Sequence, residues 1–183
     1  MKFLTKDDMD KVGEIAPHIK RYYAHRWDYH EELINEIKKM ENIEKTLELG
    51  PYLCPLVVGG DIMDLTDSHL DSYPQPIGKI YAQDAAKVPY PIEDKYYDLI
   101  IASQVMEHLG MKGEQKDVFN EFKRISKKAI ISLPYLWFAP DERDHHMIDK
   151  DTINYWTDNY EPSFEKITGS NERKRIILIY DFD

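Results

Sequence analysis

The sequence has a single cysteine, Cys54, among 183 residues, which excludes an internal disulfide and a metal site made only of cysteines. It also lacks an apolar run long enough to span a membrane. The first eight residues turn acidic before the apolar segment of a signal peptide could form. These absences predict a cytoplasmic protein with no membrane partner.

Positive charge is scarce. There are 24 lysines and arginines against 34 aspartates and glutamates, for a formal net charge of −10 at pH 7. Such a charge opposes nonspecific attraction to phosphate backbones and anionic membranes. We therefore expect no nucleic-acid partner, although a basic stripe beside the ligand cleft would reopen that possibility.

What is present is an ordinary globular composition, with 42% hydrophobic and 32% charged residues. A chain of this length suits one domain with a sizeable core. We expect a single domain over residues 1–183, in which a helical N-terminal lid, 1–42, covers a core formed by 43–183.

The central feature is an apolar run, Asp98–Ala102, with the composition of a strand buried on both faces of a sheet. It ends abruptly in polar residues: Ser103 and Gln104 follow at once, and Glu107 and His108 come shortly after. Open α/β sheets bind ligands at the carboxyl ends of their strands. The function is therefore expected at this end of the run.

The surrounding pattern alternates strands with helices, which is typical of a parallel sheet. Strands are expected at 46–49, 61–65, 78–85 and 128–133, with a terminal antiparallel pair at 164–168 and 174–180. Helices are expected to start near Thr5, to run from near Pro17 to just before Asn42, and to cover 114–126 and 150–159. The link 51–60 is too short for a full helix.

Four motifs occur in an order that resembles the class I S-adenosylmethionine-dependent methyltransferases. They are Leu47–Gly50, Asp84–Ala85, Tyr97–Ser103 with Glu107–Leu109, and Pro134 after the fifth strand. The resemblance implies an α/β, Rossmann-like, mostly parallel sheet with an antiparallel C-terminal strand and an N-terminal helical extension. It also implies S-adenosylmethionine as cofactor and methyl transfer to a small-molecule acceptor.

The resemblance also assigns cofactor contacts to the ends of successive strands, in keeping with the positional argument. These are Glu48, Leu49 and Gly50 for the amino-acid end, Asp61 or Asp64 for the ribose hydroxyls, Asp84 and Ala85 for the adenine, and Ser103 and Gln104 for the sulfonium end. A carboxylate suits the ribose because it accepts hydrogen bonds from two neighbouring hydroxyls.

One departure from the family pattern concerns glycine. Related enzymes usually carry Gly-x-Gly opening a helix that faces the cofactor carboxylate, whereas here Gly50 is followed by Pro51–Pro55 without a second glycine. Arg26, which lies with His30 at the edge of an apolar helical stripe, or a neighbouring tyrosine of the same helix is expected to supply the missing contact. The alternative for Arg26 is a side chain resting on neighbouring rings. The alternative for the whole chain is a degenerate fold that acts as a binding or scaffold module.

Candidates for a general base lie in the polar run before the last helix. They are Asp144, His145 and His146, with Asp141 and His108 as further candidates. A base is needed only if the acceptor is protonated. The alternative is a solvent-facing loop that caps the following helix through Asp149.

No metal is expected, with one alternative. Family members that use a divalent metal carry Glu-x-x-Glu-His plus a distal histidine, and this chain offers Glu107, His108 and His146. Gln104 stands in place of the first carboxylate, which removes a charge. In metal-free relatives the same Glu-His pair positions the loop.

Overall fold

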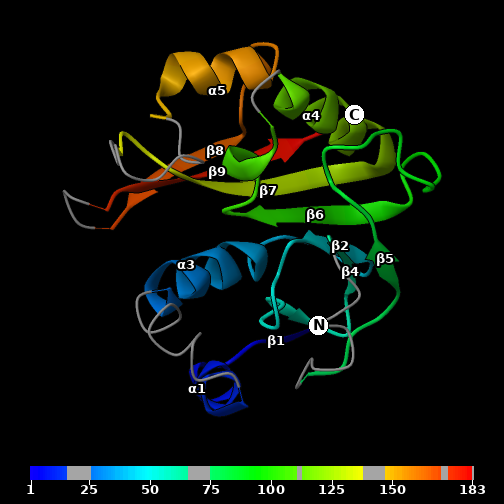
Figure 1. Ribbon diagram of the computed structural model, residues 1–183, viewed down its shortest axis with the longest axis vertical. Helices are drawn as coiled ribbons and strands as arrows, with labels where there is room; N and C mark the ends of the chain where they lie inside the picture. Colours follow the sequence, from blue (N-terminus) through cyan, green and yellow to red (C-terminus); the bar gives the residue numbers. More distant parts are fainter. Residues whose placement is uncertain (16–25, 66–74, 111–112, 138–146, 170–172, 183) are drawn as a thin grey trace.

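The computed structural model describes residues 1–15, 26–65, 75–110, 113–137, 147–169 and 173–182. A seven-stranded sheet in the order β5-β4-β2-β6-β7-β9-β8 runs through its centre (Figure 1). Its strands are β2 (Thr46–Leu49), β4 (Asp61–Asp64), β5 (Ile80–Ala82), β6 (Tyr97–Ser103), β7 (Ser126–Pro134), β8 (Phe164–Thr168) and β9 (Arg175–Asp181).

The first five strands in that order are parallel, while β9 pairs antiparallel with both β7 and β8. The expected α/β Rossmann-like sheet with an antiparallel C-terminal strand is therefore confirmed. Nearly all the expected strand boundaries agree with the structure within a few residues, because each strand is a short apolar run bounded by proline, glycine or polar residues.

Strand β6 is buried on both faces, as its composition predicts. Leu99 and Ile101 face one hydrophobic core, and Ile100 and Ala102 face the other, in the alternation that strand geometry imposes. Helices α4 (Glu114–Ile125) and α5 (Lys150–Trp156) cover one face of the sheet, and α3 (Trp27–Ile37) covers the other with α1 (Lys6–Ile15) beyond it (Figure 1).

The N-terminal segment packs as a layer of the fold. Helix α1 begins at a capping box, in which the Thr5 backbone N–H donates to Asp8 Oδ2 (3.1 Å) and the Asp8 N–H donates to Thr5 Oγ1 (3.2 Å). Strand β1 (Lys2–Phe3) pairs antiparallel with β3 (Val57–Val58). Leu33 of α3 shares a hydrophobic core with β6. The division into a lid and a core stays a prediction.

Two helix boundaries differ from expectation. Helix α3 ends at Ile37 rather than just before Asn42. It begins at Trp27, after Arg26 in the N-cap position, and the start expected near Pro17 lies outside the described residues. Helix α5 ends at Trp156 rather than at Asn159, because Asp158 (φ 55°) and Asn159 (φ 58°) adopt left-handed backbone conformations that stop a helix. Among the described residues, no helix has the length and apolar character needed to cross a membrane.

Candidate functional site

The site lies where the direction of the strand order reverses. From β2 the chain adds β4 and then β5 on one side, and it returns to add β6 and β7 on the other side. Such a switch point leaves a crevice at the carboxyl ends of the strands. A cavity of about 390 Å³ opens there, a volume within the usual range of small-molecule sites, roughly 300–1,000 Å³.

Most of the expected cofactor residues line this cavity together. Those at the carboxyl ends of strands are Glu48 in β2 with Gly50 after it, Asp64 at the end of β4, Asp84 and Ala85 after β5, and Ser103 at the end of β6 with Gln104 after it. Arg26, His30 and His108 line it from other segments. Strand geometry brings these groups together because parallel strands all end on the same edge of the sheet.

Two of the expected cofactor residues lie elsewhere. The Leu49 side chain is buried in the core beneath α4, because side chains alternate along a strand and Glu48 takes the other face. Asp61 begins β4 and so lies at the amino end of the strand, where it accepts hydrogen bonds from the Tyr97 hydroxyl (2.6 Å) and the Lys79 N–H (2.7 Å). Of the two ribose candidates, only Asp64 faces the cavity.

The candidate general bases Asp144, His145 and His146, together with Asp141, lie outside the described residues. His108, the remaining candidate, lines the cavity from a 3-10 helix, Met106–His108. The catalytic assignment to the polar run therefore stays a prediction.

The link after β2 is a turn without a helix, as its length predicts. Gly50 has a φ of 56°, and a Cβ atom added there would lie 3.1 Å from Val105 Cγ2. The Leu56 N–H donates to Glu48 Oε2 at 2.7 Å, which fastens the link to β2. Burial raises the pKa of Glu48 to about 8, although backbone N–H donors oppose this shift. Glu48 thus holds the link in place, and residues of the link form part of the cavity wall.

Because the described link after β2 forms no helix, it contributes no helical N–H donors to the cavity. Among the described lining residues, Arg26 is the only lysine or arginine. Burial lowers its pKa, and the nearby Tyr29 and Glu107 act in the opposite direction. A guanidinium is the side-chain group that best matches carboxylates and phosphates.

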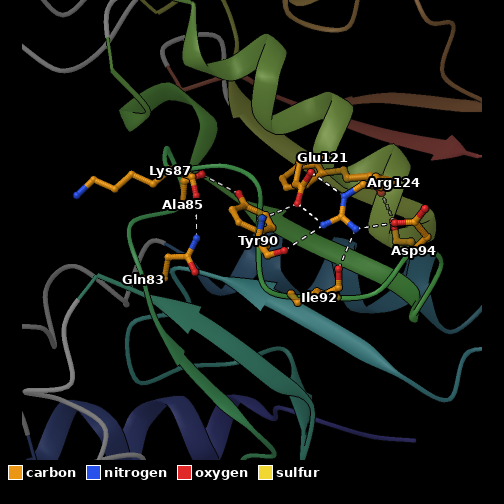
Figure 2. A network of polar contacts seen from close by, with 10 residues as sticks. Gln83, Ala85, Lys87, Tyr90, Ile92, Asp94, Glu121 and Arg124 are labelled. Atoms are coloured by element: carbon orange, nitrogen blue, oxygen red, sulfur yellow. Dashed lines mark hydrogen bonds and ion pairs between the residues drawn. The ribbon is translucent and has the colours of Figure 1, made fainter.

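The opposite wall is held by a network that sequence reasoning missed (Figure 2). Asp84 Oδ1 accepts the Ala86 N–H at 2.9 Å, and the Tyr90 hydroxyl donates to the Ala85 carbonyl at 2.7 Å. The Tyr90 N–H in turn donates to Glu121 Oε1 of α4 at 2.6 Å. Tyr90 therefore connects the wall of the cavity to a rigid helix.

Arg124 closes this network, which we call the Arg124 clamp. Its guanidinium donates to the carbonyls of Tyr90 (3.1 Å) and Ile92 (2.8 Å) and to carboxylates of Asp94 and Glu121 (both 2.6 Å) (Figure 2). No local sequence signal marks it, because an arginine three residues after a glutamate is common on helix surfaces.

A second group that sequence reasoning missed lies behind Gln104, and we call it the arginine–aromatic cluster. It consists of Arg26, Tyr29, Glu107, Trp137 and Arg175. The Arg175 guanidinium lies over the rings of Tyr29 (4.3 Å) and Trp137 (4.9 Å). Arg175, from the start of β9, is more than 140 residues from Arg26, so only the fold brings them together.

Glu107 is buried in this cluster, 1% exposed, and neither carboxyl oxygen has a hydrogen-bond partner among the described residues. Burial raises its pKa to about 8, although Arg26 and Arg175 act in the opposite direction. Two guanidiniums beside this carboxyl oppose a divalent cation, which argues against the metal alternative of Glu107, His108 and His146. His146 lies outside the described residues, and those residues contain no metal-binding group of three.

These buried groups predict a pH dependence of stability. Glu48 and Glu107 titrate near 4.5 when unfolded and near 8 when folded, so between these values the folded state holds protons that the unfolded state has lost. The free energy of unfolding then falls as pH rises. Burial lowers the pKa of His30 to about 3, so its protonation in the unfolded state makes stability rise with pH. This opposite effect is confined to pH values below 6.5.

Between pH 6.5 and 8 we therefore expect stability to decrease, by up to about 1 kcal/mol per pH unit for each buried carboxyl. Glu107→Gln should flatten this slope, whereas Glu31→Gln, at an exposed position of α3, should leave it unchanged. Urea denaturation at several pH values measures the slope. An equal slope in both variants would contradict the assignment of Glu107.

No protein-family model matches the chain, and no curated protein sequence matches it. Solved structures do match the chain. The N-methyltransferase NodS from Bradyrhizobium japonicum WM9, in complex with S-adenosyl-L-homocysteine, has a TM-score of 0.69 at 11% identity, covering 97% of this chain and 99% of NodS. A SAM-dependent methyltransferase of Leishmania major has a TM-score of 0.67 at 10% identity, covering 94% and 81%.

A third structure is magnesium protoporphyrin IX methyltransferase (ChlM) from Synechocystis PCC 6803 with bound SAM. Its TM-score is 0.63 at 12% identity, covering 97% of this chain and 90% of that one. The chain therefore has the class I S-adenosylmethionine-dependent methyltransferase fold. At these identities the likeness establishes the fold alone.

Proposed function

We propose that the chain binds S-adenosylmethionine and transfers its methyl group to a small-molecule acceptor. The observation that supports this most is the cavity at the switch point, which is lined by Asp64 and Asp84 from neighbouring strands and also by Arg26. The two carboxylates can accept hydrogen bonds from hydroxyl and amine groups of a ligand, and the guanidinium can bind a carboxylate of the ligand.

In this proposal Asp64 accepts hydrogen bonds from the ribose hydroxyls and Asp84, beside Ala85, accepts one from the adenine amine. Arg26 binds the amino-acid carboxylate, and Ser103 and Gln104 lie at the sulfonium end. The cofactor supplies an activated methyl group, so the chain has mainly to align the acceptor with it. A general base among His108, Asp144, His145 and His146 takes the proton of a protonated acceptor.

Binding of S-adenosylhomocysteine tests the proposal directly. A ligand at 100 times its dissociation constant stabilises the native state by about 2.7 kcal/mol, or roughly 5–10 °C in a protein of this size. We expect such a shift in a thermal melt and saturable heat in calorimetry. No shift at millimolar ligand would favour the alternative, a scaffold module with this fold. Turnover with a panel of acceptors then tests catalysis separately.

The net charge of −10 supports a small-molecule acceptor over nucleic acid. The described lining residues include only one lysine or arginine, so they form no basic stripe along the cavity. A cytoplasmic location is proposed on the sequence argument alone.

Tyr90 provides a test of the adenine wall. Tyr90→Phe removes the hydroxyl that donates to the Ala85 carbonyl at 2.7 Å and should weaken S-adenosylhomocysteine binding about three- to tenfold. Adenosine binding should weaken equally, because the loss concerns the adenine end. Tyr160→Phe removes another hydroxyl that donates to a backbone carbonyl, that of Asp181, away from the cavity and is the matched control. Equal affinities in the two variants would contradict this role.

A further inference from the structure

Arg175 occupies a position that the binding of the cofactor does not use. Its Nε donates to Gln104 Oε1 at 3.3 Å, and Gln104 lines the cavity, so the guanidinium stands one hydrogen bond behind the cavity wall. Gln104 Nε2 donates to Ser132 Oγ at 3.3 Å, and its backbone N–H donates to the Ser132 carbonyl at 2.9 Å. The Arg175 side chain is therefore directed by residues at the ends of β6 and β7.

The Arg175 guanidinium carbon lies over the aromatic rings of Tyr29 and Trp137, 4.3 and 4.9 Å from their centroids. Among the described residues, Gln104 is the hydrogen-bond acceptor of the Arg175 guanidinium, at Nε, which leaves the edge that carries the two Nη groups for further hydrogen bonds. Such an edge matches two oxygens of a carboxylate or phosphate. Arg175 as a whole is partly exposed.

The charge around Arg175 is not balanced. Glu107 is its one carboxyl neighbour among the described residues, and the oxygens of Glu107 accept no hydrogen bond there. The same carboxyl also lies near Arg26, so Glu107 is not a counterion of Arg175 alone. A partly buried cation that has no carboxyl of its own among the described residues is a favourable place for an anionic ligand.

We propose that the methyl acceptor carries an anionic group, a carboxylate or a phosphate, and that Arg175 binds it beside the end of β6. This rests on the proposed function, in which Arg26 serves the cofactor carboxylate and Gln104 lies at the sulfonium end. The acceptor has to meet the methyl group at that end, and Arg175 is the cation that the fold places next to it. Arg175 is therefore a specificity-determining residue.

The test uses the full chain saturated with S-adenosylhomocysteine and three fluorinated probes followed by fluorine NMR. The probes are 4-fluorobenzoate, 4-fluorophenyl phosphate and the neutral 4-fluorobenzamide. We expect one of the anions to bind at least about tenfold more tightly than the amide, and this preference to be lost in Arg175→Gln. Which anion binds distinguishes a carboxylate from a phosphate acceptor.

Arg173→Gln is the matched control, because it removes the same charge from an exposed position two residues away. It should keep the anion preference. An unaltered preference in Arg175→Gln, or equal binding of anions and amide to the parent chain, would overturn the proposal. Saturation with S-adenosylhomocysteine is verified first in every variant by calorimetry. Its failure in the parent chain would reject the proposed function, whereas saturation without an anion preference rejects only the role of Arg175.

Discussion

Arg26→Gln is expected to weaken S-adenosylhomocysteine binding by about 10- to 100-fold, which corresponds to the loss of a charge-assisted hydrogen bond of about 1.5–3 kcal/mol. The reason is local. The link after β2 forms no helix, and Arg26 is the only lysine or arginine among the described residues that line the cavity. The carboxylate of the ligand then depends on this one guanidinium. Isothermal titration calorimetry measures the change.

Two controls make this result specific. 5′-Methylthioadenosine lacks the amino-acid part, so its affinity should be the same for Arg26→Gln and the parent chain. Lys38→Gln removes an exposed charge from the C-terminal end of α3 and should leave both affinities unchanged. If Arg26→Gln weakened both ligands equally, the residue would be supporting the fold of the site rather than binding the carboxylate.

Arg124→Met should lower the free energy of unfolding by about 2–3 kcal/mol, or roughly 4–10 °C in the melting temperature. The substitution removes the hydrogen bonds that the guanidinium donates to the loop 90–94. It also leaves the Glu121 carboxyl, which is 8% exposed, without its cation. A carboxylate left buried and unpaired destabilises the fold by more than the ion pair itself contributes to stability.

Lys116→Met on the same helix is the matched control, because its ion pair with Asp158 is exposed and should contribute less than about 1 kcal/mol. In the double variant Glu121→Gln with Arg124→Met, part of the stability should return, since the unpaired charge is gone. Thermal and urea denaturation provide the values. Similar losses in Arg124→Met and Lys116→Met would contradict the structural role of the Arg124 clamp.

The sequence predicted the sheet because its signals are local. Runs such as Asp98–Ala102 are short, apolar and bounded by turn residues, and the alternation with helices implies parallel strands. The same logic placed Asp64, Asp84 and Ser103 at one edge, since each follows a strand. Of the two alternatives for the ribose, Asp61 precedes Asp64 along β4 and so lies at the amino end of the strand, where it is bonded to Tyr97 and Lys79.

What the sequence by itself determined is the α/β fold, the edge of the sheet that carries the site and the absence of a helix after β2. Only the tertiary structure brought Arg175 of β9 against Tyr29 of α3, and Arg124 of α4 against the loop that follows β5. These contacts join residues that are tens to more than a hundred positions apart, so no periodicity or spacing encodes them. Local patterns fix strands and their ends, whereas the packing of separate segments decides which charges meet.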